Sequence, residues 1–94
     1  MLFQVTMEVR IPHGLDPVYL DELKQAEKAR AQDLQRGGVW RHLWRVVGQY
    51  KNVSIFDVES AAQLHDLLTG LPLFPFMHIE VTALCRHPSA VSDD

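Results

Sequence analysis

The stretch FQVTMEVRI, residues 3–11, alternates apolar and polar side chains along its whole length. Because successive side chains of a strand point to opposite faces, this period of two predicts a β-strand with one face on a core. Residues 12–14 (Pro-His-Gly) end the strand, since proline has no N–H for the ladder and glycine favours a turn. The chain is therefore expected to open with a half-buried strand.

A long amphipathic helix is predicted after this turn. Asp16 is a suitable N-cap, and Pro17 suits the first helical position. Over residues 17–36 the apolar side chains recur at helical spacing and form one stripe, which consists of Leu20, Leu23, Ala31 and Leu34. The glycine pair at 37–38 ends this helix.

Three further strands and a second helix complete the pattern. The strands are expected at 39–47, 53–58 and 77–84, and the helix at 61–69 with Ser60 as its N-cap. Residues 71–76 form an apolar loop with two prolines. The order β-α-β-β-α-β is typical of the ferredoxin-like α+β fold, an antiparallel sheet with both helices on one face. The other face is left uncovered, so we expect a homo-oligomer.

Composition narrows the class of protein. The 94 residues carry nine Lys and Arg against twelve Asp and Glu, a formal net charge of −3, with no block of basic residues. This balance argues against nucleic-acid and membrane partners. The single cysteine, Cys85, excludes an internal disulfide and fits a reducing, cytoplasmic location. We expect one domain over residues 1–94, with a flexible tail at 87–94.

Motifs for metals and cofactors are missing from the sequence. The five histidines, at positions 13, 42, 65, 78 and 87, do not have the spacing of zinc ligands. There is no glycine-rich phosphate loop and no Rossmann fingerprint. The chain is therefore expected to work without a metal or a cofactor.

One acidic residue falls on the apolar stripe of the first helix. Glu27 follows Leu23 by four residues and precedes Ala31 by four, so the helical period places its carboxylate on the buried side. Burial would raise the pKa of this carboxyl group toward the range of a general base. Alternatively, Glu27 lies at the edge of the stripe and forms an ion pair with Lys24 or Arg30.

The second strand contains the run WRHLWR, residues 40–45. Strict alternation would place Trp40, His42 and Trp44 on one face and the two arginines, Arg41 and Arg45, on the other. Guanidinium forks suit a carboxylate, and an aromatic wall suits a small flat ring, so the run predicts a pocket for a compact anionic ligand. The alternative is that the tryptophans fill the core or an interface while the arginines form ion pairs across subunits.

Several of these segments resemble one known family. The runs MLF at 1–3, Glu27-Lys28, WRHLWR at 40–45, LPLFP at 71–75 and HPS at 87–89 resemble those of the muconolactone Δ-isomerases. The resemblance covers nearly the whole chain. It implies a cofactor-free isomerase of bacterial catechol catabolism, in the 3-oxoadipate pathway, that converts (+)-muconolactone to the 3-oxoadipate enol-lactone. It also implies a large homo-oligomer, a decamer built from dimers, with the active site between subunits.

The resemblance and the chemistry together give each candidate residue a role. Glu27 would move the proton, and Arg41 or His42 would stabilise the negative charge on the lactone oxygen. Lys24 would bind the substrate carboxylate, with Arg45 as the rival. The dry walls would come from the tryptophans and from the loop at 71–76, represented by Trp40, Leu71, Phe74 and Phe76.

Three other functions remain open from the sequence. A dehalogenase of the same family could use the same base to eliminate chloride from a chlorinated muconolactone. A non-catalytic ferredoxin-like module could bind a small acid and regulate a partner. A small cofactor-free monooxygenase could share the topology, although no motif of such enzymes occurs in this chain.

Overall fold

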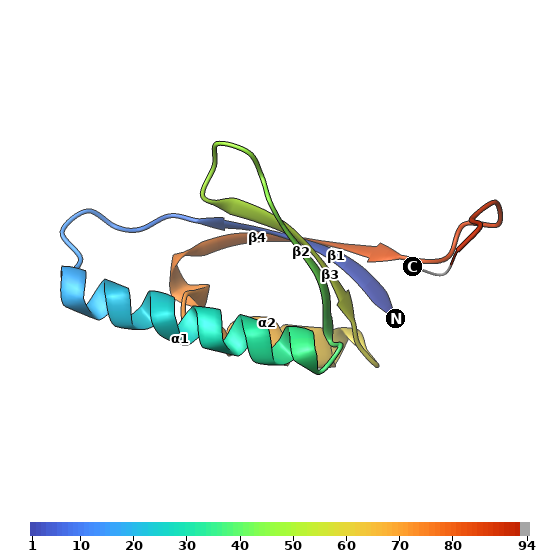
Figure 1. Ribbon diagram of the computed structural model, residues 1–94, viewed down its shortest axis with the longest axis horizontal. Coiled ribbons are helices and arrows are strands. Elements are labelled where there is room, and N and C mark those ends of the chain that lie inside the picture. The colour runs from blue at the N-terminus through green and yellow to red at the C-terminus, as the bar shows by residue number, and fades with distance from the viewer. Residues whose placement is uncertain (93–94) are drawn as a thin grey trace.

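The computed structural model describes residues 1–92 and contains a four-stranded sheet and two helices (Figure 1). In chain order the elements are β1 (Leu2–Val9), α1 (Pro17–Arg36), β2 (Trp40–Arg45), β3 (Lys51–Asp57), α2 (Ala61–Thr69), a short 3₁₀ turn (Phe74–Phe76) and β4 (Met77–Leu84). The strand order is β2-β3-β1-β4, and every neighbouring pair is antiparallel. Both helices lie on one face (Figure 1), which confirms the predicted ferredoxin-like fold.

Strand β1 is central to the core. It pairs with β3 on one side and with β4 on the other, so its backbone is bonded along both edges. Its side chains alternate as predicted: Phe3, Val5 and Met7 are buried on the face that the helices cover. Their neighbours Gln4 and Thr6 lie on the opposite face.

The two helices begin and end where the sequence predicts. The Asp16 carboxylate accepts a hydrogen bond from the Tyr19 N–H at 3.4 Å, and the Ser60 hydroxyl accepts one from the Gln63 N–H at 3.1 Å. These caps satisfy amide groups that the helix itself leaves unpaired. After α1 it is Gly38, with φ +81°, that takes the left-handed conformation.

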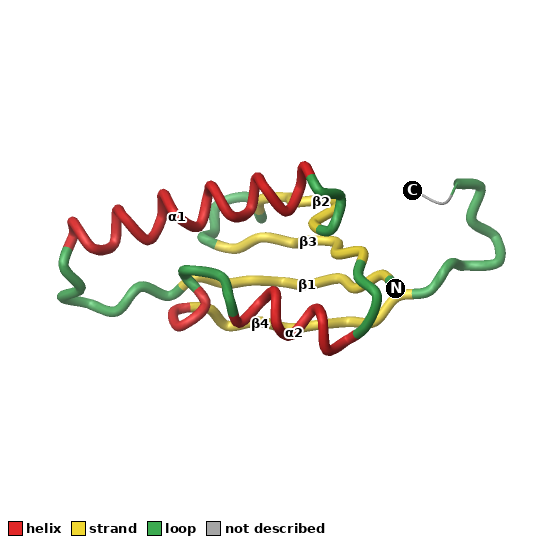
Figure 2. Tube along the Cα trace, turned by 90° about the horizontal axis from the view of Figure 1, so that it is seen from below, coloured by secondary structure: helices red, strands yellow, loops and turns green. Residues whose placement is uncertain are grey.

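The helices cover different halves of the sheet. Seen from the helix side in Figure 2, α1 runs along β2 and β3, whereas α2 lies over β1 and β4. Two residues of the predicted stripe on α1, Ala31 and Leu34, are buried, and Leu64 and Leu68 of α2 enter the same core. The N-terminal turns of α1 extend beyond the end of the sheet (Figures 1 and 2).

Three predicted strand limits were wrong. Strand β1 ends at Val9 rather than Ile11, and β2 covers residues 40–45 rather than 39–47. Strand β3 begins at Lys51, two residues earlier than expected, because Lys51 and Asn52 pair with the end of β1. These limits depend on which backbone groups find partners across the sheet, and local composition does not determine that.

A β-bulge in β2 overturns the predicted faces of the WRHLWR run. Trp40 pairs with Phe56 and His42 pairs with Ile55, so Arg41 is the extra residue of the bulge. The alternation therefore shifts by one: Trp40 faces the helices, whereas His42 and Trp44 lie on the open face. The predicted common face of Trp40, His42 and Trp44 is wrong for this reason. Arg41 and Arg45 do not share a face either.

The open face of the sheet and the C-terminal segment lie on the side away from the helices. Trp44 is 63% exposed there and stacks on His42, with ring centroids 6.3 Å apart. Residues 87–90 form a turn closed by the Ala90 N–H and the His87 carbonyl at 3.0 Å. The flexible tail predicted at 87–94 includes residues 93–94, which lie outside the described residues.

Candidate active site

A cavity of about 440 Å³ lies between α1 and the covered face of the sheet. Its walls include apolar side chains from three strands and the loop before β4, namely Met7, Val9, Trp40, Leu43, Leu73 and Met77. Its charged lining consists of Lys24, Glu27, Lys28, Arg45 and Lys51. One carboxylate therefore shares an open cavity with four cationic side chains, in a protein whose net charge is −3.

Glu27 is half-buried in this cavity, as the helical period predicts. Its Oε1 accepts a hydrogen bond from the backbone N–H of Leu73 at 2.9 Å. Burial raises the pKa of the Glu27 carboxyl group above its ordinary value of 4.5, while the bond from Leu73 acts in the opposite direction. The desolvated carboxyl group is thus a stronger base than an exposed glutamate.

The alternative of an ion pair with Lys24 or Arg30 is wrong. No cationic group within residues 1–92 forms an ion pair with the Glu27 carboxylate. Because Oε1 is held by Leu73, the orientation of the carboxylate is restricted, and Oε2 has no protein partner in the described chain. One oxygen is anchored and the other is available for a ligand.

The loop before β4 supplies this anchor because of its backbone geometry. The Phe74 N–H donates to the Leu71 carbonyl and the Phe76 N–H to the Leu73 carbonyl, both at 2.9 Å. These two turns leave the Leu73 N–H without a backbone acceptor, and it points to Glu27 instead. The buried Leu73 side chain, 3% exposed, fixes the loop against the core.

Tyr50 organises two of the cations that line the cavity. Lys24 Nζ lies 5.6 Å from the centroid of the Tyr50 ring, and the Arg45 guanidinium carbon lies 5.4 Å from it. Both positive charges contact one aromatic ring, which favours them by cation–π attraction. Lys24 comes from α1 and Arg45 from β2, so the ring brings together the two residues predicted as rivals for a substrate carboxylate.

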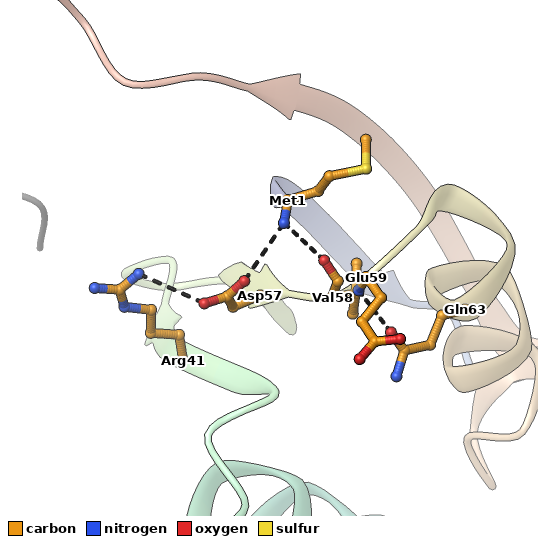
Figure 3. A network of polar contacts seen from close by, with 6 residues as sticks. All are labelled: Met1, Arg41, Asp57, Val58, Glu59 and Gln63. Carbon is orange, nitrogen blue, oxygen red and sulfur yellow. Dashed lines mark hydrogen bonds and ion pairs between the residues drawn. The ribbon is translucent and has the colours of Figure 1, made fainter.

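Arg41 and His42 are not near Glu27 in one chain. Both lie on the open face, where they line a second hollow together with Trp44 and the segment 86–92. The Arg41 guanidinium is 3.9 Å from the Asp57 carboxylate, which also contacts the amino group of Met1 at 3.6 Å (Figure 3). Arg41 follows Trp40 and faces away from the helices, and the bulge leaves His42 on that same face, so the sheet separates both side chains from the cavity.

The residues that represent the loop at 71–76 lie outside the cavity of their own chain. Leu71 is buried in the core and Phe74 packs against it, and neither they nor Phe76 line the cavity. The loop contributes Leu73 instead, through both its side chain and its N–H. Of the predicted walls, Trp40 does line the cavity.

Sequence reasoning gave no role in the site to Tyr50 or Asn52, which line the cavity, and it included Leu73 only as part of the loop at 71–76. The first two were assigned to a turn, although the Val9 N–H bonds to the Tyr50 carbonyl at 2.9 Å and Asn52 belongs to β3. No periodic pattern could have found Leu73, since its function is carried by a backbone N–H.

Within residues 1–92 no group of three or more His, Cys, Asp or Glu side chains is arranged to hold a metal ion. No helix of that part of the chain is both long enough and apolar enough to cross a bilayer.

The fold and the cavity define a class of protein. An oriented, partly desolvated carboxylate beside apolar walls can remove and return a proton, and the surrounding cations select a small anion. The site is thus that of an acid–base enzyme on a ferredoxin-like scaffold.

The comparisons with known proteins identify the family. The family model described as muconolactone delta-isomerase matches residues 1–90. Muconolactone Delta-isomerase 1 of Acinetobacter lwoffii is 60% identical over all of this chain and 98% of its own length, and the Pseudomonas aeruginosa muconolactone Delta-isomerase is 55% identical with the same coverage. A crystal structure of muconolactone isomerase superposes with a TM-score of 0.94 at 56% identity, and the match covers 100% of this chain and 98% of that one. The chain belongs to the muconolactone delta-isomerase family.

The raised pKa of Glu27 predicts how stability depends on pH. Between pH 4.5 and the raised pKa, the folded chain binds a proton at Glu27 more tightly than the unfolded chain does. The free energy of unfolding contributed by this group therefore falls as the pH rises through that window. The Glu27→Gln variant lacks this titration, so its stability relative to the wild type should increase as the pH rises from 4.5 through the raised pKa.

Urea unfolding at fixed protein concentration over this pH range measures the effect. Glu22→Gln, at an exposed position of the same helix, is the control for the loss of one negative charge. A difference between Glu27→Gln and the wild type that stays constant with pH would show that Glu27 is not desolvated.

Proposed function

We propose that this protein is a muconolactone Δ-isomerase, which converts (+)-muconolactone to the 3-oxoadipate enol-lactone without a cofactor. The observation that carries the proposal is the Glu27 carboxylate, anchored by Leu73 inside a cavity lined by cations. Full-length identity to enzymes of that name supports the choice of substrate. Nothing in the structure separately supports the alternative activity, which is the elimination of chloride from a chlorinated muconolactone.

The reaction moves one proton between two carbons of the lactone ring. The proton leaves the ring carbon that bears the carboxymethyl group and is returned to the carbon beside the carbonyl group. The electron pair left behind is delocalised through the conjugated ring onto the carbonyl oxygen, so a dienolate forms between the two steps. The site therefore needs a base, a dry environment and a donor near that oxygen.

Glu27 fits the part of the base. The oxygen that Leu73 does not hold, Oε2, can accept the proton from one ring carbon and return it to the other on the same ring face. A pKa raised by burial brings the two protonation states closer in free energy, which favours both accepting and releasing the proton. Apolar side chains around the carboxylate keep water from exchanging with the proton between the steps.

Lys24 and Arg45 fit the part of a clamp for the substrate carboxylate. Both line the cavity and both contact the Tyr50 ring, so the same part of the cavity holds both charges. A guanidinium group can bind the carboxylate with two hydrogen bonds, whereas an ammonium group acts as a point charge. The two residues are therefore partners in this proposal and not rivals.

Replacing the base tests the proposal. Glu27→Gln keeps the shape and the acceptor for Leu73 but removes the basicity, so kcat should fall by about 10²- to 10⁴-fold. A spectroscopic assay with muconolactone and no added cofactor measures the change. Glu22→Gln should turn over at the wild-type rate. Near-normal turnover by Glu27→Gln would place the base elsewhere.

The clamp predicts a different kinetic signature. Lys24→Met and Arg45→Met should each raise KM by about tenfold, while kcat changes little, because the substrate carboxylate does not take part in the proton transfer. Arg30→Met removes an exposed charge of α1 outside the cavity and is the matched control. An unchanged KM in either clamp variant would remove that residue from carboxylate binding.

The uncovered face of the sheet supports assembly into a homo-oligomer. Trp44 is largely exposed on it, beside half-buried Ile55 and Val53 of the neighbouring strand. A second copy could cover this apolar strip, and the decamer built from dimers that the resemblance implies would contain such contacts. Because the sheet separates Arg41 and His42 from the cavity of their own chain, an assembly could bring them only to the cavity of another copy. The roles of Arg41 and His42 in stabilising the negative charge stay predictions, as do the wall positions of Leu71, Phe74 and Phe76. The cytoplasmic location is also a prediction.

Light scattering after size-exclusion chromatography tests the assembly. The wild type should have a molar mass several times that of one chain, and a decamer would have ten times that mass. Trp44→Glu should lower the molar mass because a charge would have to be buried in the interface. Ala29→Glu, at an exposed position of α1, is the matched control. A monomeric wild type would contradict this part of the proposal.

A further inference from the structure

The indole of Trp40 has a buried hydrogen-bond donor without a partner. Trp40 is 2% exposed, and its ring stacks on Phe56 with centroids 4.8 Å apart. Its Nε1–H is shielded from solvent and finds no acceptor within residues 1–92; no other buried side-chain nitrogen or oxygen of that range shares this condition. Buried donors in folded proteins are nearly always paired, so this one requires an explanation.

Packing alone does not explain an indole at this position. Stacking on Phe56 needs an aromatic face, and a phenylalanine could supply one without burying an unpaired N–H. The buried Ser54 hydroxyl, on the strand that pairs with β2, does not serve the indole, since it donates to Asn52 at 2.7 Å. The unpaired donor therefore belongs to a residue of the core that also lines the cavity.

The location of Trp40 matches a need of the proposed reaction. It lines the same cavity as Glu27, and it begins β2, whereas Arg45 ends that strand beside Tyr50. The two ends of β2 therefore offer different groups: cations at one end and a neutral, buried donor at the other. The substrate has the same polarity, with a carboxylate on its side chain and a carbonyl oxygen on its ring.

The bulge in β2 gives a second reason to assign the ring oxygen to Trp40. It places Arg41 and His42 on the open face, so the donors expected from the sequence are absent from the cavity of their own chain. Trp40, which precedes the bulge, pairs with the buried Phe56 and faces the helices. A neutral N–H on a rigid, stacked ring needs little reorganisation as negative charge develops, which is the condition for effective oxyanion stabilisation.

We infer that the indole N–H of Trp40 donates a hydrogen bond to the ring carbonyl oxygen of the lactone and stabilises the dienolate. This inference rests on the proposed function and adds the residue that binds the developing charge. When the ring enters, Nε1–H gains the acceptor that it lacks in the free protein. The cavity wall includes the flexible side chains of Met7 and Met77, which can yield to let the ring approach.

The two tryptophans of the chain allow a direct test. A ¹⁵N–¹H TROSY spectrum of the Glu27→Gln protein should show two indole cross-peaks, and Trp44→Phe assigns them. Titration with muconolactone should move the Trp40 indole proton downfield as the bond forms, while the Trp44 peak serves as internal reference. A Trp40 peak that does not move at saturation would overturn the inference.

Kinetics of Trp40→Phe provide the second measurement. The variant keeps an aromatic ring but loses the N–H, so kcat should fall by about 10²-fold with KM within about threefold of the wild type. Wild-type kcat in a folded Trp40→Phe protein would overturn the inference. If that variant does not fold, the spectrum of the Glu27→Gln protein still decides the matter.

The two proposals fail in different ways. If the wild type does not isomerise muconolactone and neither indole peak moves, the proposed function is wrong and the inference falls with it. If turnover is normal and depends on Glu27 while the Trp40 peak stays fixed, only the role of Trp40 is wrong.

Discussion

The hydrogen bond from the Leu73 N–H to Glu27 is the contact on which the arrangement of the site depends. It joins α1 to a loop 46 residues further along the chain and closes one wall of the cavity. Burying a carboxylate is unfavourable unless polar groups compensate. One backbone N–H compensates only in part, so the pKa stays raised while the side chain is held in place. The same contact thus fixes the orientation of the carboxylate without cancelling the rise in its pKa.

The bulge at Arg41 decides which side chains can cooperate with that carboxylate. A shift of one residue in a strand moves every later side chain to the other face. Trp40, Leu43 and Arg45 therefore face the helices, whereas His42 and Trp44 face away. One irregularity divides a six-residue run between the cavity and the open face of the sheet. A small domain of this kind can build a reactive site and an interface on the two sides of one strand.

Charge is distributed to match an anionic ligand. The chain is acidic overall, yet four of its nine Lys and Arg side chains line the cavity with Glu27. Such local positive charge attracts a small anion although the protein as a whole would repel it. Tyr50 contributes without any charge of its own, because its ring draws Lys24 and Arg45 together from different elements.

The sequence alone determined the elements, their order, both helix caps and the inward position of Glu27, because these features follow from local spacing and capping chemistry. It also pointed to Lys24, Arg45 and Trp40 as residues of the site. The tertiary structure decided the rest. The bulge arises from pairing between β2 and β3, the Leu73 contact comes from a backbone group, and Tyr50 meets its cations only when a helix and a strand pack together. None of these interactions leaves a periodic signal, since each joins atoms that are far apart in the chain or that belong to no side chain.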